Sequence, residues 1–510
     1  MHNIYKTTAL VTVFTAFEHL LGFLYRIILS RTLGAEGLGV YQAAFTVYAV
    51  FLTISASGLP VTLSRTLSKH RARGDYRRGH AATSAAVLIA LMISLPVTVG
   101  LFLLRDPFSK IFADSRSADL FYILLFGLSF TSLYTVIRGN FWGNRRFFAY
   151  SVVELFEEIS MITIGVFLIL VIPSKLPNAN KAAVAVFVSH FLSFLVALFY
   201  YLFKGGRFTS PKREFLPLLK SSLPVFSMRT LSSLITSLIS VLFPMRLMAA
   251  GMSAGQAMSK YGIVFGMVMP VLMLPSTLIS SVALVIVPEL AECYYKKEKE
   301  KLAALAEKAL NITCLTAFLL IPLFFVCGES VGILLFSDAE SGKLIARSCL
   351  LLLPMSLTVI TTSMLNSMGC EKHTLLFFLL GSAVMLLAVW FLPPYLGSGA
   401  LVLGMTLDYL LTAICSLVVL RKRTTLRSGK FCLKLTLVSL AAAIAGYALN
   451  ELLMRVTSFV LAMIVSAVLM ISIEALLLWL LKLVDFKAVF AKLPFLSRAR
   501  KKKKAASSTK

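Results

Sequence analysis

Stretches of roughly 20 mostly apolar residues recur from one end of this sequence to the other. A helix of that length measures about 30 Å, the thickness of the hydrocarbon core of a bilayer. Hydrophobic residues make up 58% of the 510 residues and charged residues only 14%. A soluble fold cannot bury so much apolar surface, so the pattern predicts an all-α polytopic membrane protein. About fourteen transmembrane helices are expected, near residues 8–30, 38–64, 81–104, 118–138, 150–172, 182–203, 223–245, 262–288, 309–328, 347–368, 374–392, 400–420, 435–454 and 459–481.

The basic residues are unevenly distributed between the connecting segments. The formal net charge is +27. If the loops are numbered alternately from an inner N-terminus, the inner ones hold most of the Lys and Arg, as in 65–80, 204–222 and 421–434. This asymmetry predicts that both termini are cytoplasmic, and it favours contact with anionic lipids. No basic stretch lies on a soluble module, so nucleic acid is not an expected partner.

The sequence shows no catalytic or cofactor motif. It has no phosphate-cradling glycine loop, and its predicted outer loops lack clustered His, Asp or Glu. None of the seven cysteines has CxxC spacing, so neither a metal site nor a disulfide framework is indicated. We therefore expect a transporter rather than an enzyme, with no cofactor beyond a coupling ion, Na⁺ or H⁺.

A weak internal repeat suggests how the helices are grouped. Segments 40–70 and 260–294 each open with a Tyr near a glycine turn, carry a proline in the apolar run and end at a charged loop. Such repeats are common in transporters that bind substrate between two halves. The predicted organisation is an N-terminal lobe at 1–203, a cytoplasmic linker at 204–222, a C-terminal lobe at 223–420, two further helices at 421–482 and a basic cytoplasmic tail at 483–510.

Three ionisable residues lie inside the first apolar run: Glu18, His19 and Arg26. At 100° per residue, His19 and Arg26 are only about 20° apart on one helix face. A charge at this depth costs a few kcal/mol on insertion scales, so such groups usually face a bundle interior or a water-filled cavity. The alternative for Arg26 is that its side chain extends to the outer headgroups.

Further ionisable residues recur in later predicted helices. Arg229 could line a cavity or extend to the inner surface. Asp408 and Glu474 lie deep in their helices and could serve ion coupling or pair within the bundle. The glutamates at 154–158 are interpreted as a solvated helix start that favours acids, and His190 as a hydrogen-bonded packing residue.

Three segments resemble a known family. They are 20–69, which contains "LLGFLYRIILSRTLGAEGLG", 243–292, which contains "FPMRLMAAGMSAGQAMSKYG", and "LLLLPMSLTVITTSMLNSMGCEKHT" at 350–374. They resemble the stage V sporulation protein B group among the lipid-linked oligosaccharide flippases of the MOP exporter superfamily. Positions 18 and 19 are Glu and His here, whereas the group often has Ser-Arg.

The resemblance implies two six-helix pseudo-symmetric lobes around a central cavity, plus two C-terminal helices. It also implies relatedness to MurJ-type lipid II flippases, a bacterial plasma-membrane location and an undecaprenyl-pyrophosphate-linked substrate. Arg26 matches the group's "YR" position and Arg31 its "R-x-L-G" position. Arginine binds phosphate bidentately, so we expect Arg26 and Arg229, then His19, to contact the headgroup, with Glu18 nearby.

Other functions are compatible with parts of this pattern. A cation-coupled multidrug exporter of the same superfamily would hold its substrate on acidic residues, of which the first helix offers Glu18. A membrane glycosyltransferase is disfavoured by the short outer loops. A non-transporting scaffold that contacts other cell-wall synthesis proteins is the remaining alternative.

Overall fold

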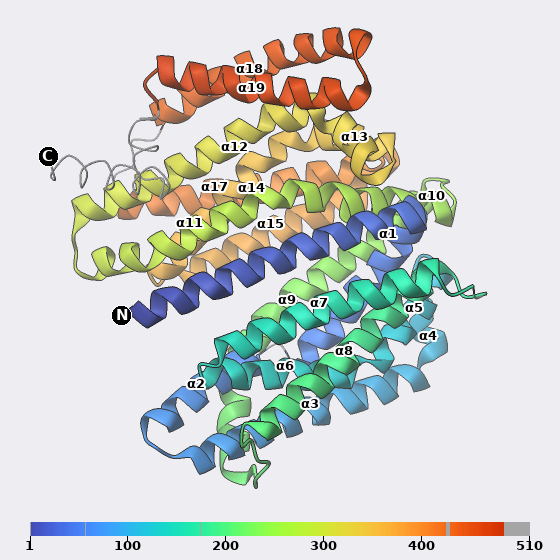
Figure 1. Cartoon of the computed structure of the whole chain (residues 1–510), viewed down its shortest axis with the longest axis vertical. Helices are drawn as coiled ribbons and strands as arrows, with labels where there is room; N and C mark the ends of the chain where they lie inside the picture. Colours follow the sequence, from blue (N-terminus) through green and yellow to red (C-terminus); the bar gives the residue numbers. More distant parts are fainter. Residues whose placement is uncertain (1, 57, 174, 425–428, 484–510) are drawn as a thin grey trace, which may run out of the picture. The chain divides into compact units, whose positions relative to one another are not determined.

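The computed structural model describes residues 2–483 except 57, 174 and 425–428, and within these ranges it contains helices and no strand (Figure 1). Contacts divide the chain into two compact units, residues 1–270 with 382–404, and residues 271–381 with 405–510. The elements up to the break between the units are α1 (His2–Ala56), α2 (Leu59–Ala72), α3 (Tyr76–Leu103), α4 (Arg105–Ser109), α5 (Ser115–Phe126), α6 (Leu128–Gly143), α7 (Phe147–Leu170), α8 (Asn178–Phe203), α9 (Lys212–Ala249), α10 (Ala254–Tyr261) and the π-helix η1 (Gly262–Val268). They are followed by α11 (Met269–Tyr295), α12 (Lys299–Phe336), α13 (Ala339–Ser348), the 3₁₀ helix η2 (Cys349–Leu351), α14 (Leu352–Ser367), α15 (Glu371–Phe391), α16 (Pro393–Leu396), α17 (Gly399–Arg423), α18 (Gly429–Val456) and α19 (Phe459–Leu480).

The helices are long and apolar enough to cross a membrane many times. Eleven candidate spans are found in the described residues, or twelve if the bent pair α5–α6 is one span. One of the eleven, Val11–Ala72, is 62 residues long, enough to cross a bilayer of about 30 Å twice. Helix α7 is not among them, and it carries three glutamates. The chain is thus an all-helical multi-pass membrane protein, and the count of fourteen stays a prediction.

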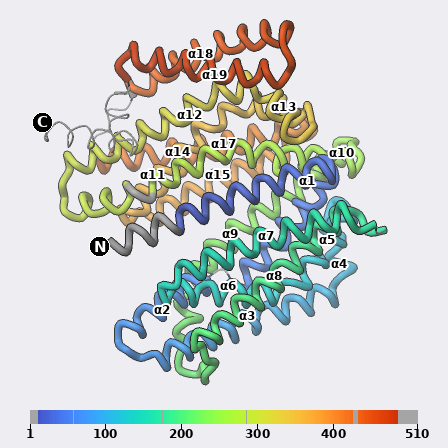
Figure 2. The backbone as a smooth tube through the Cα atoms, viewed as in Figure 1, coloured from blue at the N-terminus to red at the C-terminus, as the bar shows by residue number. Residues whose placement is uncertain are grey.

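Helix α1 contains a break that turns one run of sequence into two helical arms. Gly34 has φ 67° and ψ 178°, a conformation that glycine adopts without a side-chain clash. Figure 2 shows the change in direction along α1. After the break, α1 packs closely on α10 and η1, because a Cβ at Gly39 would lie 2.0 Å from the Met258 carbonyl oxygen. Glycine is needed on both sides, since a Cβ at Gly262 would lie 2.0 Å from the Ala35 carbonyl oxygen.

The π-helix η1 leaves one backbone carbonyl without its regular partner. In π geometry each carbonyl accepts from the N–H five residues later, as the Met269 N–H donates to the Val264 carbonyl. The Phe265 carbonyl would need the N–H of residue 270, but that residue is Pro270 and has none. A buried carbonyl is costly to leave unpaired, so another donor is required there.

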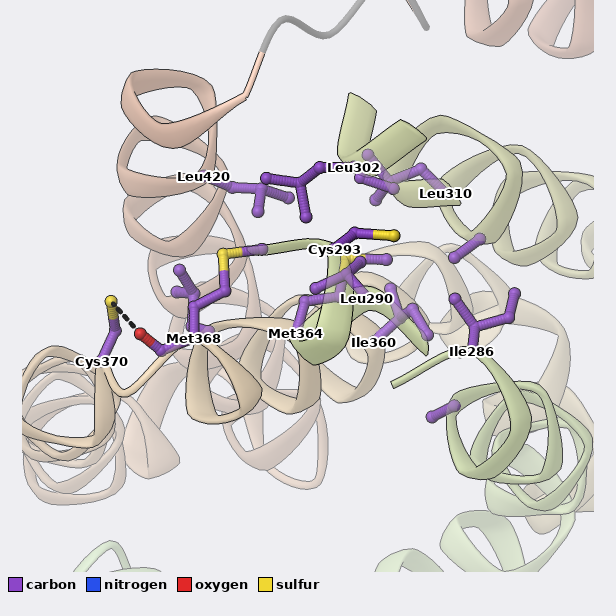
Figure 3. Close-up of a cluster of buried hydrophobic side chains, with 14 of the residues drawn as sticks. Ile286, Leu290, Cys293, Leu302, Leu310, Ile360, Met364, Met368, Cys370 and Leu420 are labelled. Atoms are coloured by element: carbon purple, nitrogen blue, oxygen red, sulfur yellow. Dashed lines mark hydrogen bonds between the residues drawn. The ribbon is translucent and has the colours of Figure 1, made fainter. Parts of the chain in front are cut away.

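The second unit has an apolar core of its own. Side chains from α11, α12, α14 and the start of α15 pack together, among them Leu290, Leu310, Ile360 and Met364, each at most 3% exposed (Figure 3). A separate hydrophobic cluster joins α12 to α18 and α19, with Cys314 against Leu435 and Leu478. Burial of such side chains among themselves is what orders these helices on one another.

Two charged segments between expected spans are mostly helical. The segment 204–222, expected as a linker, is part of α9 from Lys212 onward, and α9 packs against α1, α2 and α3. The contacts place α9 in the first unit. The predicted lobes are a different division, based on a sequence repeat, which the contacts do not test, so the lobe boundaries stay a prediction. The charged segment 289–309 continues α11 to Tyr295 and then begins α12 at Lys299. The tail from 484 onward lies outside the described residues.

Candidate functional site

Arg138 of α6 lies among aromatic and acidic side chains inside the first unit. Its Nη2 atom donates to the Glu154 carboxylate and, at 3.0 Å, to the Tyr150 hydroxyl. Its guanidinium carbon lies 5.2 Å from the ring centroids of both Tyr134 and Tyr150, within cation–π range. The Tyr150 hydroxyl itself donates to Glu154. Arg138 is therefore held on several sides by α6 and α7, and its charge is compensated in place.

Glu157, one helical turn after Glu154, links this centre to α8. Its Oε1 atom lies 2.9 Å from His190 Nε2, and its Oε2 atom lies 3.8 Å from Arg138 Nη1. The His190 Nδ1 atom is buried without a hydrogen-bond partner in the described part of the chain. With Nε2 directed at a carboxylate, Nδ1 is the ring nitrogen that remains available for a further hydrogen bond.

Helix α1 and the next turn of α7 add two more acids. A Cβ built on Gly22 would lie 3.0 Å from the Glu158 Oε1 atom, so α1 leaves room for this carboxylate. Glu18 is half-buried and interacts electrostatically with Glu154, Arg138 and Glu158. The two acids thus extend the Arg138 centre toward α1.

Arg26 supplies the donor that the π-helix lacks. Its Nη1 atom donates to the Phe265 carbonyl at 3.2 Å, which is the carbonyl that Pro270 cannot serve. Arg26 also interacts electrostatically with Glu158. A guanidinium has five N–H donors, so this bond uses only part of its capacity. Arg26 therefore closes α1 on η1 and can still offer donors to a second group.

These groups form one partly buried charge network within the first unit. Its members are Glu18, Arg26, Arg138, Glu154, Glu157, Glu158 and His190. The network contains four acids and two arginines, so its net charge is negative when all the acids are ionised and His190 is neutral. Such a group can take up protons or a small cation, and its cost in a membrane is reduced by the internal pairing.

The sequence interpretation of the α7 glutamates was wrong. They were expected at a solvated helix start, but Glu154 is the eighth residue of α7 and its side chain is only 9% exposed. The spacing i, i+3, i+4 of Glu154, Glu157 and Glu158 puts them on one face, where they meet basic groups of neighbouring helices. This spacing was the feature of the sequence that could have indicated a buried acidic face. His190, interpreted as hydrogen-bonded packing, does have a polar partner, and that partner is Glu157.

The other residues expected to contact a headgroup are not gathered into this network. The side chains of His19 and Arg31, both on α1, are exposed, and so is that of Arg229 on α9. His19 and Arg26 share a helix face as predicted, but Glu18 rather than His19 belongs to the network. The roles assigned to these residues stay predictions.

The two acids considered for ion coupling lie in the second unit. Asp408 of α17 accepts a long hydrogen bond of 3.5 Å from the Thr412 hydroxyl, and a Cβ at Gly381 would lie 2.0 Å from its Oδ1 atom. Glu474 of α19 is 2% exposed, and neither carboxyl oxygen has a hydrogen-bond partner in the described residues. Among those residues no group of three or more His, Cys, Asp and Glu side chains is arranged to hold a metal ion.

Comparison with known proteins identifies the family of this chain. Residues 4–294, more than half of the sequence, match the family model described as "Polysaccharide biosynthesis protein". The chain belongs to the polysaccharide biosynthesis protein family. A relative within reach of sequence comparison is stage V sporulation protein B of Bacillus subtilis (strain 168), 23% identical over 354 residues, which are 67% of this chain and 68% of that protein.

Solved structures show that this member of the polysaccharide biosynthesis protein family has the fold of the MOP superfamily. The lipid II flippase MurJ in an inward closed conformation matches with a TM-score of 0.70 at 14% identity, covering 92% of this chain and 98% of that one. An inward-facing multidrug resistance MATE family transporter matches with a TM-score of 0.65 at 17% identity, covering 80% and 94%. The family expected from the three sequence segments is therefore confirmed.

Proposed function

We propose that this chain is a flippase that exports an undecaprenyl-pyrophosphate-linked glycan or peptidoglycan precursor across the bacterial plasma membrane by alternating access. The observation that carries the proposal is the family membership, together with a fold that matches a lipid II flippase over 92% of the chain. The basic-loop asymmetry supports cytoplasmic termini and hence an outward direction of transport.

Arg26 supports the choice of an anionic substrate. An arginine inside an apolar helix is costly, and this one retains N–H donors beyond the bond to the Phe265 carbonyl. Charge-assisted bonds from a guanidinium to a pyrophosphate replace hydration that the headgroup loses on leaving water. Arg26 is thus the residue of choice for a headgroup contact, with Arg229, Arg31 and His19 as additional donors.

The identity of the substrate is testable in cells. Depletion of the protein is expected to cause one undecaprenyl-linked intermediate to accumulate on the cytoplasmic side, which lipid extraction and mass spectrometry would identify. Re-expression of the wild type should clear it. If depletion causes a cellular defect but leaves the undecaprenyl-linked pools unchanged, that result would contradict a flippase function. It would favour the non-transporting scaffold.

The charge network supports coupling to an ion, H⁺ or Na⁺. Four carboxylates near two arginines provide acids that can change charge during a transport cycle. Glu18→Gln is expected to reduce the dependence of transport on an imposed ion gradient, and Glu451→Gln, an exposed acid on α18, serves as the matched control. Equal gradient dependence in the wild type and both variants would remove the network from the coupling mechanism.

A second candidate is a cation-coupled multidrug exporter. It is favoured by the net acidic character of the network and by the MATE-like fold. Proteoliposomes distinguish the two functions, because an exporter would move a lipophilic cation such as ethidium under an ion gradient. The flippase proposal expects no such transport and expects movement of a lipid-linked pyrophosphate instead.

A further inference from the structure

A small cavity lies at one end of the first unit, outside the charge network. Its volume is about 270 Å³, and the ends of α2, α6 and α8 meet the starts of α3 and α7 around it. Basic and hydrogen-bonding groups predominate among the polar side chains in its wall. Those that the argument uses are Arg71, Asp75, His80, Arg146 and Lys204.

The acid in this wall is already neutralised. Asp75 caps the start of α3 by accepting from the Arg78 N–H at 3.1 Å, and it pairs with the Arg78 guanidinium at 3.3 Å. By contrast, Arg71, Arg146 and Lys204 have no ion-pair partner among the described residues. The cavity is therefore lined by two arginines that no acid of the described residues neutralises and by Lys204, whose ammonium lies 6.0 Å and 5.7 Å from the ring centroids of Tyr200 and Phe203.

Hydrogen bonds within the wall fix some of these donors in place. Arg146 donates through Nη2 to the Lys204 carbonyl at 3.3 Å, which ties the start of α7 to the end of α8. His80 accepts from the Arg207 N–H at Nδ1, at 3.3 Å, so its Nε2 atom carries the proton in the neutral ring and is a donor. Arg146 is also the N-cap residue of α7, whose first turn has no side-chain cap.

From this arrangement, we propose that the cavity binds a phosphate group. Two arginines, a lysine and a histidine line one small space. Guanidinium, ammonium and imidazole N–H groups match the oxygens of a phosphate, and the uncapped helix start adds positive potential. The volume accommodates a phosphate with a small substituent but not a drug-sized molecule. The phosphate can come from a lipid headgroup or from a soluble ion, and the site is independent of the proposed transport function.

The test compares the full-length protein with the double variant Arg71→Gln/Lys204→Gln. The matched control is Arg73→Gln/Arg77→Gln, which also removes two exposed charges, neither of them in the cavity wall, and keeps the Arg78–Asp75 pair. One arm titrates inorganic phosphate into detergent-purified protein by calorimetry. The other measures, by native mass spectrometry, the retention of phosphatidic acid from nanodiscs that contain phosphatidylcholine and phosphatidic acid.

We expect the double variant to bind at least ten-fold more weakly than the wild type and the control in one of the two arms. Loss of phosphate binding in detergent identifies a soluble anion site, whereas loss confined to the phosphatidic acid arm identifies a lipid headgroup site. Equal binding by all three proteins in both arms overturns the proposal. Thermal unfolding of each protein, measured in parallel, verifies that any loss occurs in folded protein.

Discussion

The close contact between α1 and η1 makes a single methyl group a severe perturbation. In Gly262→Ala the new Cβ would lie 2.0 Å from the Ala35 carbonyl oxygen and 2.7 Å from the Gly39 nitrogen. Ordinary contacts begin near 3.4 Å, so the two segments must separate by at least about 1 Å. That movement would stretch the 3.2 Å bond from Arg26 to the Phe265 carbonyl beyond hydrogen-bonding distance.

The expected cost is that of overpacking together with a broken buried hydrogen bond. Overpacking costs about 1–3 kcal/mol, and an orphaned buried carbonyl adds about 1–3 kcal/mol. Thermal unfolding of the purified protein in detergent should show a clear decrease in Tm for Gly262→Ala. Gly100→Ala on α3 is the matched control, because a Cβ there has no neighbour within 4 Å and alanine is the better helix former.

The same pair of variants gives a functional readout. Gly262→Ala is expected to impair transport through displacement of Arg26, whereas Gly100→Ala is expected to keep it. An unchanged Tm for Gly262→Ala, with wild-type transport, would refute the close backbone packing and the role of the Arg26–Phe265 bond.

Three further predictions concern other charged groups. Arg138→Leu is expected to destabilise the protein by about 3–5 kcal/mol, since it strands buried carboxylates, and a Tm equal to the wild type's would contradict the pairing. Burial disfavours ionisation of Asp114, but hydrogen bonds from Arg116 outweigh it and hold the Asp114 pKa below its usual value. This stabilisation is complete above the unfolded pKa of about 3.9 and is lost as pH falls through the lower folded pKa, so Asp114→Asn should lack that acid-side decrease in Tm. Gly381→Ala would place a Cβ 2.0 Å from the Asp408 carboxylate, and it is expected to lower Tm and displace that acid, as a reduced yield of folded protein in size-exclusion chromatography would reveal.

The helical architecture could be predicted from sequence because it depends on local properties. Apolar runs of membrane-spanning length appear directly in the residue order, and most of the candidate spans coincide with the expected ones. The break at Gly34 falls in the gap between the expected spans 8–30 and 38–64, but the continuation of helix on both sides of it, which merges the two runs into α1, was not visible in hydropathy. The helical start of α9 inside a basic, proline-containing segment was missed for a similar reason, since Pro is tolerated near a helix start.

The charge network could be predicted only in part, because its pairing depends on which helix faces meet. Arg26 and Glu18 were identified because a charged side chain within an apolar membrane helix costs free energy. Nothing in the order of residues states that Arg138 on α6 meets Glu154 on α7, or that Glu157 meets His190 on α8. The partner of Arg26, a backbone carbonyl freed by a proline more than 200 residues away, has no side-chain signature at all.

The proposed flippase function assigns Arg26 a contact with phosphate, and one binding measurement tests this contact directly. Undecaprenyl pyrophosphate would be titrated into purified wild type, Arg26→Lys, Arg26→Gln and the exposed control Arg73→Lys. Lysine keeps the charge and can still donate to the Phe265 carbonyl, but it loses the bidentate fork. We predict that Arg26→Lys binds at least ten-fold more weakly than the wild type without a matching loss of Tm, that Arg26→Gln binds weaker still, and that Arg73→Lys is unchanged. Equal affinity of the wild type and Arg26→Lys would contradict a bidentate phosphate contact and leave Arg26 as the partner of η1 alone.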